Sequence, residues 1–347
     1  MPAPALTPLA ASLPETVPFV GPEAIERRTG VPIKARIGAN ESSFGPSPKA
    51  IAAIAATAAE SWKYGDPEVY DIRQALALHH GIGADEVSVG EGVDGLLGLC
   101  VRLFAGPGDT VVTSLGGYPT FNYHVTGFGA HLHAVPYRDD REDLDALLAA
   151  VLSTKAKIVY LANPDNPMAS WSSADAVMRF TEALPPTTLL LLDEAYGEFA
   201  PPGTLPPIDT ARPNVLRLRT FSKAYGLAGM RCGYAIGNRR LIRAFERVRN
   251  HFGVASVTQA AAIAALADQD YLDSVVVRTN AAKDRIAALV RANGLTPLPS
   301  ATNFVAVDCG ADAAFASAVL NGLAEHGIFV RKPGAPGLDR CIRITAG

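Results

Sequence analysis

Residues 220–231 have the sequence Thr220-Phe-Ser-Lys-Ala-Tyr-Gly-Leu-Ala-Gly-Met-Arg231. This stretch places Lys223 directly after Ser222 and eight residues before Arg231, with two glycines in between. Lysine supplies an amine for a Schiff base, whereas a hydroxyl and a guanidinium supply donors for a phosphate. Glycine lets the backbone come close to such a ligand. The stretch therefore predicts a covalent cofactor site with a phosphate anchor, although a lone lysine would indicate only a solvated loop.

Three strand-like segments each end in polar residues. The short apolar runs 157–162 and 188–192 are typical of buried parallel strands, and residues 215–220 lead directly into the lysine stretch. The first two are followed by Asn163-Pro-Asp-Asn-Pro167 and Asp193-Glu-Ala-Tyr196. Open α/β sheets bind ligands at the carboxyl ends of their strands. We therefore expect the three polar segments to form one site.

With these motifs the chain resembles the fold-type I pyridoxal-phosphate aminotransferases, and within them the histidinol-phosphate aminotransferase-like group. Residues 39–48, Ala-Asn-Glu-Ser-Ser-Phe-Gly-Pro-Ser-Pro, are similar to the N-terminal signature of that group. The resemblance runs from about residue 18 to residue 345. It implies an α/β fold, in which a large domain with a mostly parallel seven-stranded sheet between helices is joined to a smaller α+β domain. We expect an N-terminal arm over 1–47 that contributes to the small domain, the large cofactor-binding domain over 48–250 and the small C-terminal domain over 251–347.

The resemblance implies pyridoxal 5'-phosphate (PLP) as cofactor and a role for each matching residue. Lys223 would hold the cofactor covalently and then shuttle the proton. Asp193 would pair with the pyridine nitrogen, which makes the ring an electron sink. Tyr196 and Asn166 would hydrogen-bond to the ring's phenolic oxygen. From the residues alone, Asp193 could instead cap a helix, Asn166 could form a turn before Pro167, and Tyr196 could be packing.

For the phosphate, the resemblance implies side-chain donors from Ser222 and Arg231, with Thr220 assisting. Further donors are expected from residues 90–97, where a glycine-rich turn follows a short strand and opens a helix. A helix N-terminus offers free N–H groups and a partial positive charge, which suits a dianion. We assign this role to the backbone N–H groups of Val93 and Asp94. Glycine-rich turns before helices are common, so this signal is weak by itself.

Two aromatic residues complete the expected cofactor site. Phe121 aligns with the aromatic residue that stacks on the cofactor ring, although core packing is the alternative for any single phenylalanine. Tyr64 resembles the tyrosine that reaches across a dimer to the neighbouring phosphate. The resemblance therefore implies a homodimer in which each subunit completes the site of the other.

The C-terminal segment carries the expected substrate contacts. Arg343 resembles the arginine that clamps a substrate's carboxylate or phosphate, for which a planar guanidinium fork is well suited. Arg331 is either a second anchor or a surface residue, and Asn40 is expected in the same pocket. The chain departs from the family at Met168-Ala169, where Thr-Gly is usual, and at Phe19, where a tyrosine often contacts the substrate phosphate. Histidinol phosphate and an aromatic amino acid therefore both remain candidates, each with a 2-oxo acid as partner.

Composition limits the other classes of function. The chain has 347 residues, 48% of them hydrophobic, and a net charge of −3, so no basic excess indicates a nucleic-acid partner. No apolar run approaches the roughly 20 residues that span a bilayer, and the first 18 residues lack the pattern of a secretory signal. The four cysteines and seven histidines show no metal-binding spacing, so we expect no metal. A cytoplasmic enzyme with reduced thiols is the simplest interpretation.

The resulting hypothesis is an aminotransferase of amino-acid biosynthesis, which moves an amino group from a small-molecule donor to the cofactor and then to a 2-oxo acid. A decarboxylase or other lyase of the threonine-phosphate decarboxylase type is the alternative on the same scaffold, and it would release carbon dioxide. A PLP-binding protein without turnover is a third hypothesis. The complete set of Lys223, Asp193 and Arg231 argues against that third hypothesis.

Overall fold

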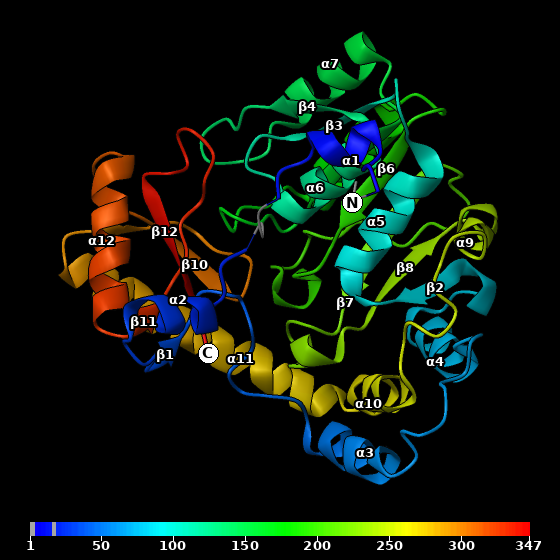
Figure 1. Ribbon diagram of the computed structural model, residues 1–347, viewed down its shortest axis with the longest axis horizontal. Coiled ribbons are helices and arrows are strands. Elements are labelled where there is room, and N and C mark those ends of the chain that lie inside the picture. Colours follow the sequence, from blue (N-terminus) through cyan, green and yellow to red (C-terminus); the bar gives the residue numbers. More distant parts are fainter. Residues whose placement is uncertain (1–3, 16–18) are drawn as a thin grey trace.

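The computed structural model describes residues 4–15 and 19–347. Residues 1–3 and 16–18, which include the expected start of the family resemblance and part of the N-terminal arm, lie outside the described residues. A large body built on one sheet and a smaller α+β part make up the chain, and the long helix α11 (Gln269–Ala292) runs beneath both (Figure 1). No helix within 4–15 and 19–347 is both long enough and apolar enough to cross a membrane.

The large body is organised around a seven-stranded sheet. Its strands lie in the order β2 (Val87–Gly90), β8 (Gly233–Gly237), β7 (Val215–Thr220), β6 (Leu189–Asp193), β5 (Ile158–Ala162), β3 (Thr110–Ser114) and β4 (His131–Val135). β8 runs antiparallel to both of its neighbours, and the other adjacent pairs are parallel. The structure confirms the predicted mostly parallel seven-stranded sheet.

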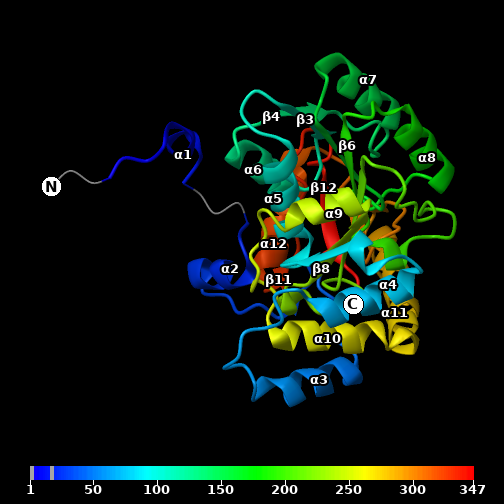
Figure 2. The ribbon, with the colours of Figure 1, turned by 90° about the vertical axis from the view of Figure 1, so that its right-hand side faces the viewer.

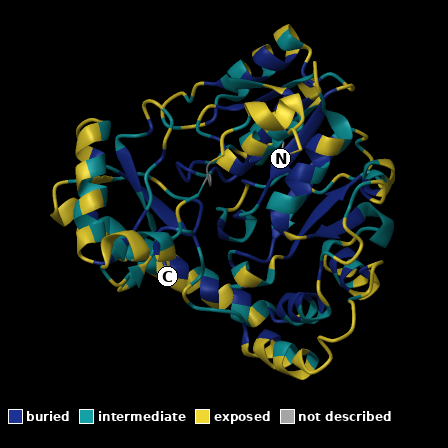
Figure 3. Cartoon of the chain, viewed as in Figure 1, coloured by how far each residue is buried: buried dark blue, intermediate teal, exposed yellow. Residues whose placement is uncertain are grey.

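Helices cover both faces of this sheet, which explains why its central strands are apolar on both sides. One face packs against α5 (Gly92–Phe104), α6 (Pro119–Gly127) and α9 (Arg239–Phe245), and the other against α7 (Leu144–Thr154) and α8 (Ala174–Ala183). Alternate residues of β5 and β6 enter the two cores. The strands are accordingly buried while the outer helices keep exposed faces (Figure 3).

Several helices begin at the polar residues that helix capping favours. Ser47 accepts a hydrogen bond from the backbone of Ala50 at the start of α3 (Pro48–Ala58), and Pro48 occupies its first turn. Asp143 and Ser173 cap α7 and α8 in the same way. The serine cap and the proline of the first turn both favour a helix that begins at Pro48.

The smaller part combines two sheets with flanking helices. An antiparallel sheet has the order β12 (Cys341–Thr345), β10 (Phe304–Asp308) and β9 (Thr296–Pro297), and β1 (Ala35–Arg36) pairs in parallel with β11 (Ile328–Phe329). This second pair joins the N-terminal arm to the C-terminal part. The remaining helices are α1 (Pro8–Ser12), α2 (Pro22–Thr29), α4 (Tyr70–His80), α10 (Ser256–Leu266) and α12 (Ala313–Glu325).

The boundary between the two parts is not marked by a simple linker. α10 packs against α3 and α4 of the large body, and α3 and α10 lie side by side in Figures 1 and 2. Residues 256–266 therefore pack with the large body, although they follow the expected boundary. The division at residue 250 remains a prediction.

Candidate active site

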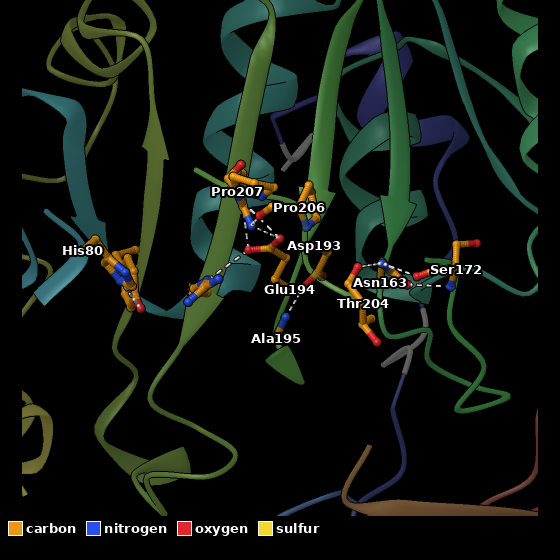
Figure 4. Close-up of polar contacts among 12 residues, drawn as sticks. His80, Asn163, Ser172, Asp193, Glu194, Ala195, Thr204, Pro206 and Pro207 are labelled. Carbon is orange, nitrogen blue, oxygen red and sulfur yellow. Dashed lines mark hydrogen bonds and ion pairs between the residues drawn. The ribbon is translucent and has the colours of Figure 1, made fainter. Parts of the chain in front are cut away.

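The site begins at the carboxyl end of β6, where Asp193 is buried. Its Oδ1 accepts a hydrogen bond from the backbone N–H of Ala195 (2.9 Å; Figure 4), and its Oδ2 accepts one from the Tyr160 hydroxyl (2.7 Å). Burial raises the pKa of Asp193 above its ordinary value. A buried carboxylate of this kind favours a cationic partner, because a nearby positive charge stabilises its ionised form.

The next residue, Glu194, is fully buried and locks β6 to β7. Its carboxylate receives Arg217 Nη2 at 2.5 Å and Arg219 Nε at 2.9 Å. The Arg217 guanidinium also donates to two proline carbonyls at 2.8 Å, those of Pro206 and Pro207 (Figure 4). Successive side chains of a strand point to opposite faces, so this ion network braces the strand behind Asp193.

Lys223 follows β7 and is half-buried. Its Nζ donates to the carbonyl oxygen of Asn40 at 3.2 Å and lies 5.6 Å from the centre of the Tyr196 ring. Burial, and next the positive charge of Arg343, lower the pKa of Lys223 to about 8. A substantial fraction of this amine is therefore neutral near physiological pH, as a nucleophile or base requires.

Asn40 joins the N-terminal arm to both parts of the molecule. Its Nδ2 donates to the Tyr196 hydroxyl at 2.8 Å, and its Oδ1 accepts from Thr345 Oγ1 of β12 at 3.2 Å. Its carbonyl oxygen accepts from Asn303 Nδ2 at 3.1 Å as well as from Lys223. The backbone φ of Asn40 is +57°, a left-handed conformation that asparagine tolerates better than most residues. The expected pocket residue is thus fixed by contacts to four others.

A second cluster lies where α5 begins. A Cβ built on Gly92, whose φ is +81°, would lie 2.6 Å from Arg231 Nη2, so the guanidinium occupies the space beside this turn. A Cβ built on Gly233 would lie 2.7 Å from the backbone nitrogen of Val93. The two glycines therefore leave room for Arg231 beside the turn and for the backbone of Val93 against β8, and Asp94 follows Val93 in the first turn of α5. These donors and the helix N-terminus fit a phosphate dianion.

Ser222 and Thr220 lie at the end of β7 and are both buried. The Thr220 hydroxyl donates to the carbonyl oxygen of Cys232 (3.2 Å) and accepts from the backbone N–H of Ser222 (3.0 Å). The Thr220 hydroxyl proton is thus used in a hydrogen bond within the loop. Thr220 would therefore assist phosphate binding only indirectly, by fixing the position of Ser222.

Phe121 is packed into the hydrophobic core beside β5. Its ring is fully buried and stacks on Tyr160, with centroids 4.6 Å apart and an interplanar angle of 20°. Tyr118, three residues earlier, is half-buried, and its ring lies 6.4 Å from that of Phe19. Burial raises the pKa of Tyr118, with the charge of Asp94 as the next cause. Direct stacking of Phe121 on a cofactor remains a prediction, and Tyr118 is the aromatic residue nearer to solvent.

Arg343 and Arg331 face each other across a backbone bridge between β12 and residue 331. Arg343 donates to Asn166 Oδ1 and to the carbonyl oxygen of Gly38, and within the described residues its buried Nε has no partner. Burial lowers the pKa of Arg343 to about 10. The Arg331 guanidinium lies 5.1 Å from the Phe19 ring centroid, so Arg331 is a partly buried neighbour of the site.

Tyr64 lies apart from the rest of the predicted cofactor residues. Its side chain is 83% exposed, and its ring is 4.7 Å from that of the exposed Phe252. Trp62 beside it is 79% exposed. These aromatic side chains form a surface patch, and large exposed aromatic residues are typical of protein interfaces.

Neither the role of Tyr160 nor the number of contacts that Asn40 makes was predicted from the sequence. Tyr160 has a signal in the sequence, because it is the one hydroxyl-bearing side chain in the apolar run 157–162. The structure aligns Tyr160 with Leu191 and Ala162 with Asp193 in the parallel register of β5 and β6. Only that register shows that Tyr160 and Asp193 share a face.

The comparisons with known proteins agree with this geometry. The family described as Aminotransferase class I and II matches residues 32–347. The histidinol-phosphate aminotransferase of Rhodospirillum centenum is 36% identical over 338 residues, which cover 96% of this chain and 92% of that protein. The protein of the same name from a Geobacillus species is 33% identical, again over 96% and 92%.

Solved structures are similar over nearly the whole chain. The crystal structure of histidinol-phosphate aminotransferase from Sinorhizobium meliloti, in complex with pyridoxal-5'-phosphate, is 57% identical with a TM-score of 0.95, covering 98% of this chain and 92% of that one. A putative histidinol-phosphate aminotransferase from Erwinia carotovora has a TM-score of 0.81 at 26% identity, covering 90% of each chain. The resemblance seen in the sequence is confirmed, and the chain belongs to the class I and II aminotransferase family.

Proposed function

We propose that this chain is a PLP-dependent aminotransferase whose amino donor is histidinol phosphate and whose acceptor is a 2-oxo acid. The observation that supports the substrate class is the backbone pairing of Arg331 with Arg343, whose positive charge acts on Lys223. Two neighbouring arginines, one of them close enough to a reactive amine to lower its pKa, suit substrates that carry a carboxylate or a phosphate. The choice of donor is supported by two relatives named histidinol-phosphate aminotransferase. This chain covers 92% of the length of each.

When bound, PLP supplies an electron sink for the carbanion that forms as the α-proton leaves. Lys223 would hold the cofactor and then move that proton as a general base, a role its lowered pKa suits. Asp193 would keep the pyridine nitrogen protonated. The Tyr196 hydroxyl and the Asn166 amide would hydrogen-bond to the phenolic oxygen.

The phosphate would be held by the cluster at the start of α5. Its proposed donors are Ser222, Arg231 and the backbone N–H groups of Val93 and Asp94, with Thr220 fixing the loop. At the opposite end, Arg343 would clamp the substrate's anionic group and Asn40 would line the pocket. An anionic group held at a fixed position also orients the carbon–hydrogen bond that is broken, so the clamp contributes to the rate as well as to binding.

The proposal includes a homodimer in which Tyr64 reaches the phosphate of the neighbouring site. The exposed patch of Tyr64, Trp62 and Phe252 supports an interface there. Mixed dimers test this idea. Lys223→Ala and Tyr64→Ala homodimers should each be impaired, and mixing them should give dimers with one site carrying neither change. Recovery of activity on mixing is expected, and no recovery despite subunit exchange would contradict a shared site.

We also place the enzyme in the cytoplasm. All four cysteines, Cys100, Cys232, Cys309 and Cys341, are free and buried, which suits a reducing compartment.

The substrate assignment is tested by visible absorbance of the PLP-loaded protein while amino donors are added one at a time. Histidinol phosphate should convert the cofactor to its aminated form, and a 2-oxo acid should restore the original spectrum. Histidinol, which lacks the phosphate, is the matched control and should be much weaker. A full response to an aromatic amino acid and none to histidinol phosphate would replace the proposed donor. Carbon dioxide release without amination would indicate the lyase.

A further inference from the structure

Tyr160 lies in the middle of β5 and is only 1% exposed. In the parallel pairing of β5 with β6, Tyr160 is opposite Leu191 and Ala162 is opposite Asp193. Paired residues of neighbouring strands point to the same face, and residues two apart on one strand do so as well. Tyr160 and Asp193 therefore project from the same face, and their Oη and Oδ2 atoms are 2.7 Å apart.

The phenol ring of Tyr160 has little freedom to leave this position. The fully buried Phe121 stacks on it at 4.6 Å between centroids. Burial and the adjacent Asp193 charge raise the pKa of Tyr160 far above its ordinary value, so its hydroxyl keeps its proton and donates. The hydrogen bond therefore has a fixed donor and a fixed direction.

Each oxygen of the Asp193 carboxylate accepts one hydrogen bond. Tyr160 bonds to Oδ2 and the backbone of Ala195 to Oδ1, which leaves a lone pair on each oxygen. Hydrogen bonds to a carboxylate favour its ionised form, whereas burial opposes ionisation. To accept a hydrogen bond from a protonated ring nitrogen, a carboxylate has to be ionised, and one of its free lone pairs has to point toward that nitrogen.

We propose that Tyr160 is a positioning residue, which acts through Asp193 to hold this carboxylate ionised and aimed at the pyridine nitrogen of the cofactor. The inference rests on the proposed function, because it requires Asp193 to meet that nitrogen. Phe121 serves the same end by fixing the Tyr160 ring.

The test compares the binding of two compounds to the cofactor-free protein: PLP, and the analogue in which a carbon replaces the ring nitrogen. Tyr160→Phe removes one oxygen and keeps the ring that stacks on Phe121. Its dissociation constant for PLP should rise about ten- to one-hundred-fold, the range for losing one hydrogen bond to a charged group. Its affinity for the carbon analogue should stay within about twofold of wild type.

Tyr137→Phe is the matched control, because Tyr137 donates to a different buried carboxylate, Asp165, at 2.8 Å. It should not discriminate between the two compounds. In an Asp193→Asn background, Tyr160→Phe should have no further effect on PLP affinity. Binding is measured by equilibrium dialysis, and the melting temperature of each variant reports on its fold.

The outcomes separate the inference from the proposed function. If wild type prefers PLP to the analogue but Tyr160→Phe weakens both equally, Tyr160 is merely structural and the inference is overturned. Unchanged PLP affinity in Tyr160→Phe would overturn it too. If wild type binds both compounds equally, Asp193 does not meet the ring nitrogen, and the proposed contact fails together with the role of Tyr160.

Discussion

In the cofactor-free protein, Lys223 should react with amine-directed reagents at a pH well below the ordinary range of lysine. Burial is the main cause and the Arg343 charge the next, and together they lower its pKa from 10.5 to about 8. Only a neutral amine reacts with an acylating reagent. At pH 7, about one Lys223 in ten would be neutral, against about one in 3,000 for a lysine with the unshifted pKa.

The assay is competitive acetylation with a small reagent between pH 6 and 11, quantified for each lysine-containing peptide by mass spectrometry. The rate for Lys223 should level off above about pH 8 to 9, and exposed lysines of the same chain provide the reference. In Arg343→Gln the midpoint should move upward, because a positive charge that disfavours the ammonium form is gone. Saturating PLP should abolish the labelling.

A Lys223 midpoint at or above 10 would refute the reasoning, since it would mean that burial and the arginines do not act on this amine. A midpoint near 8 that Arg343→Gln leaves unchanged would refute only the contribution of Arg343 and leave burial as the cause.

The remaining predictions concern stability, substrate and phosphate. Glu194→Gln should destabilise the protein by about 3–5 kcal/mol in urea unfolding, because it leaves the buried Arg217 and the partly buried Arg219 without their anion; a loss below about 1 kcal/mol would contradict this. Arg331→Ala should raise KM for histidinol phosphate more than for the 2-oxo acid, whereas Arg343→Ala should impair both half-reactions. If the two variants changed the kinetics in the same way, the two arginines would not have different roles. Gly92→Ala should weaken PLP binding at least about tenfold, because its φ is +81° and the new Cβ would meet a guanidinium nitrogen. Gly229→Ala, where a Cβ meets nothing within 4 Å, is its control and should bind normally.

The fold was predictable because the deciding signals are local. Short apolar runs followed by polar segments indicate parallel strands. Parallel strands place their carboxyl ends at the same edge of the sheet, independently of the detailed side-chain contacts. Asp193, at the end of β6, and Lys223, after β7, were found in this way. The antiparallel direction of β8 had no such local signal, since it depends on how the chain returns between β2 and β7.

The contacts within the site were less predictable, because they join segments that are far apart in the chain. Asn40 meets Thr345 across 305 positions, and Tyr160 meets Asp193 only through the register of two strands. A motif names the residue type at one position but does not say which neighbour will accept its hydrogen bond. Phe121 shows the consequence, since the same alignment suits a ring against the cofactor and a ring against Tyr160.

Taken together, the pKa shifts in the site indicate which charges a ligand should carry, and they do so more specifically than any single residue. Burial raises the pKa of Asp193, so the carboxylate favours a positive partner. At the other residues burial acts in the opposite sense, and it lowers the pKa of Lys223 and of Arg343, which favour negative partners. A neutral ligand would leave both ends unsatisfied. A ligand with a cationic ring nitrogen toward Asp193 and anionic groups toward the lysine and arginines would stabilise both, because each buried charge gains a partner of opposite sign. The site is therefore electrostatically complementary to PLP with an anionic substrate.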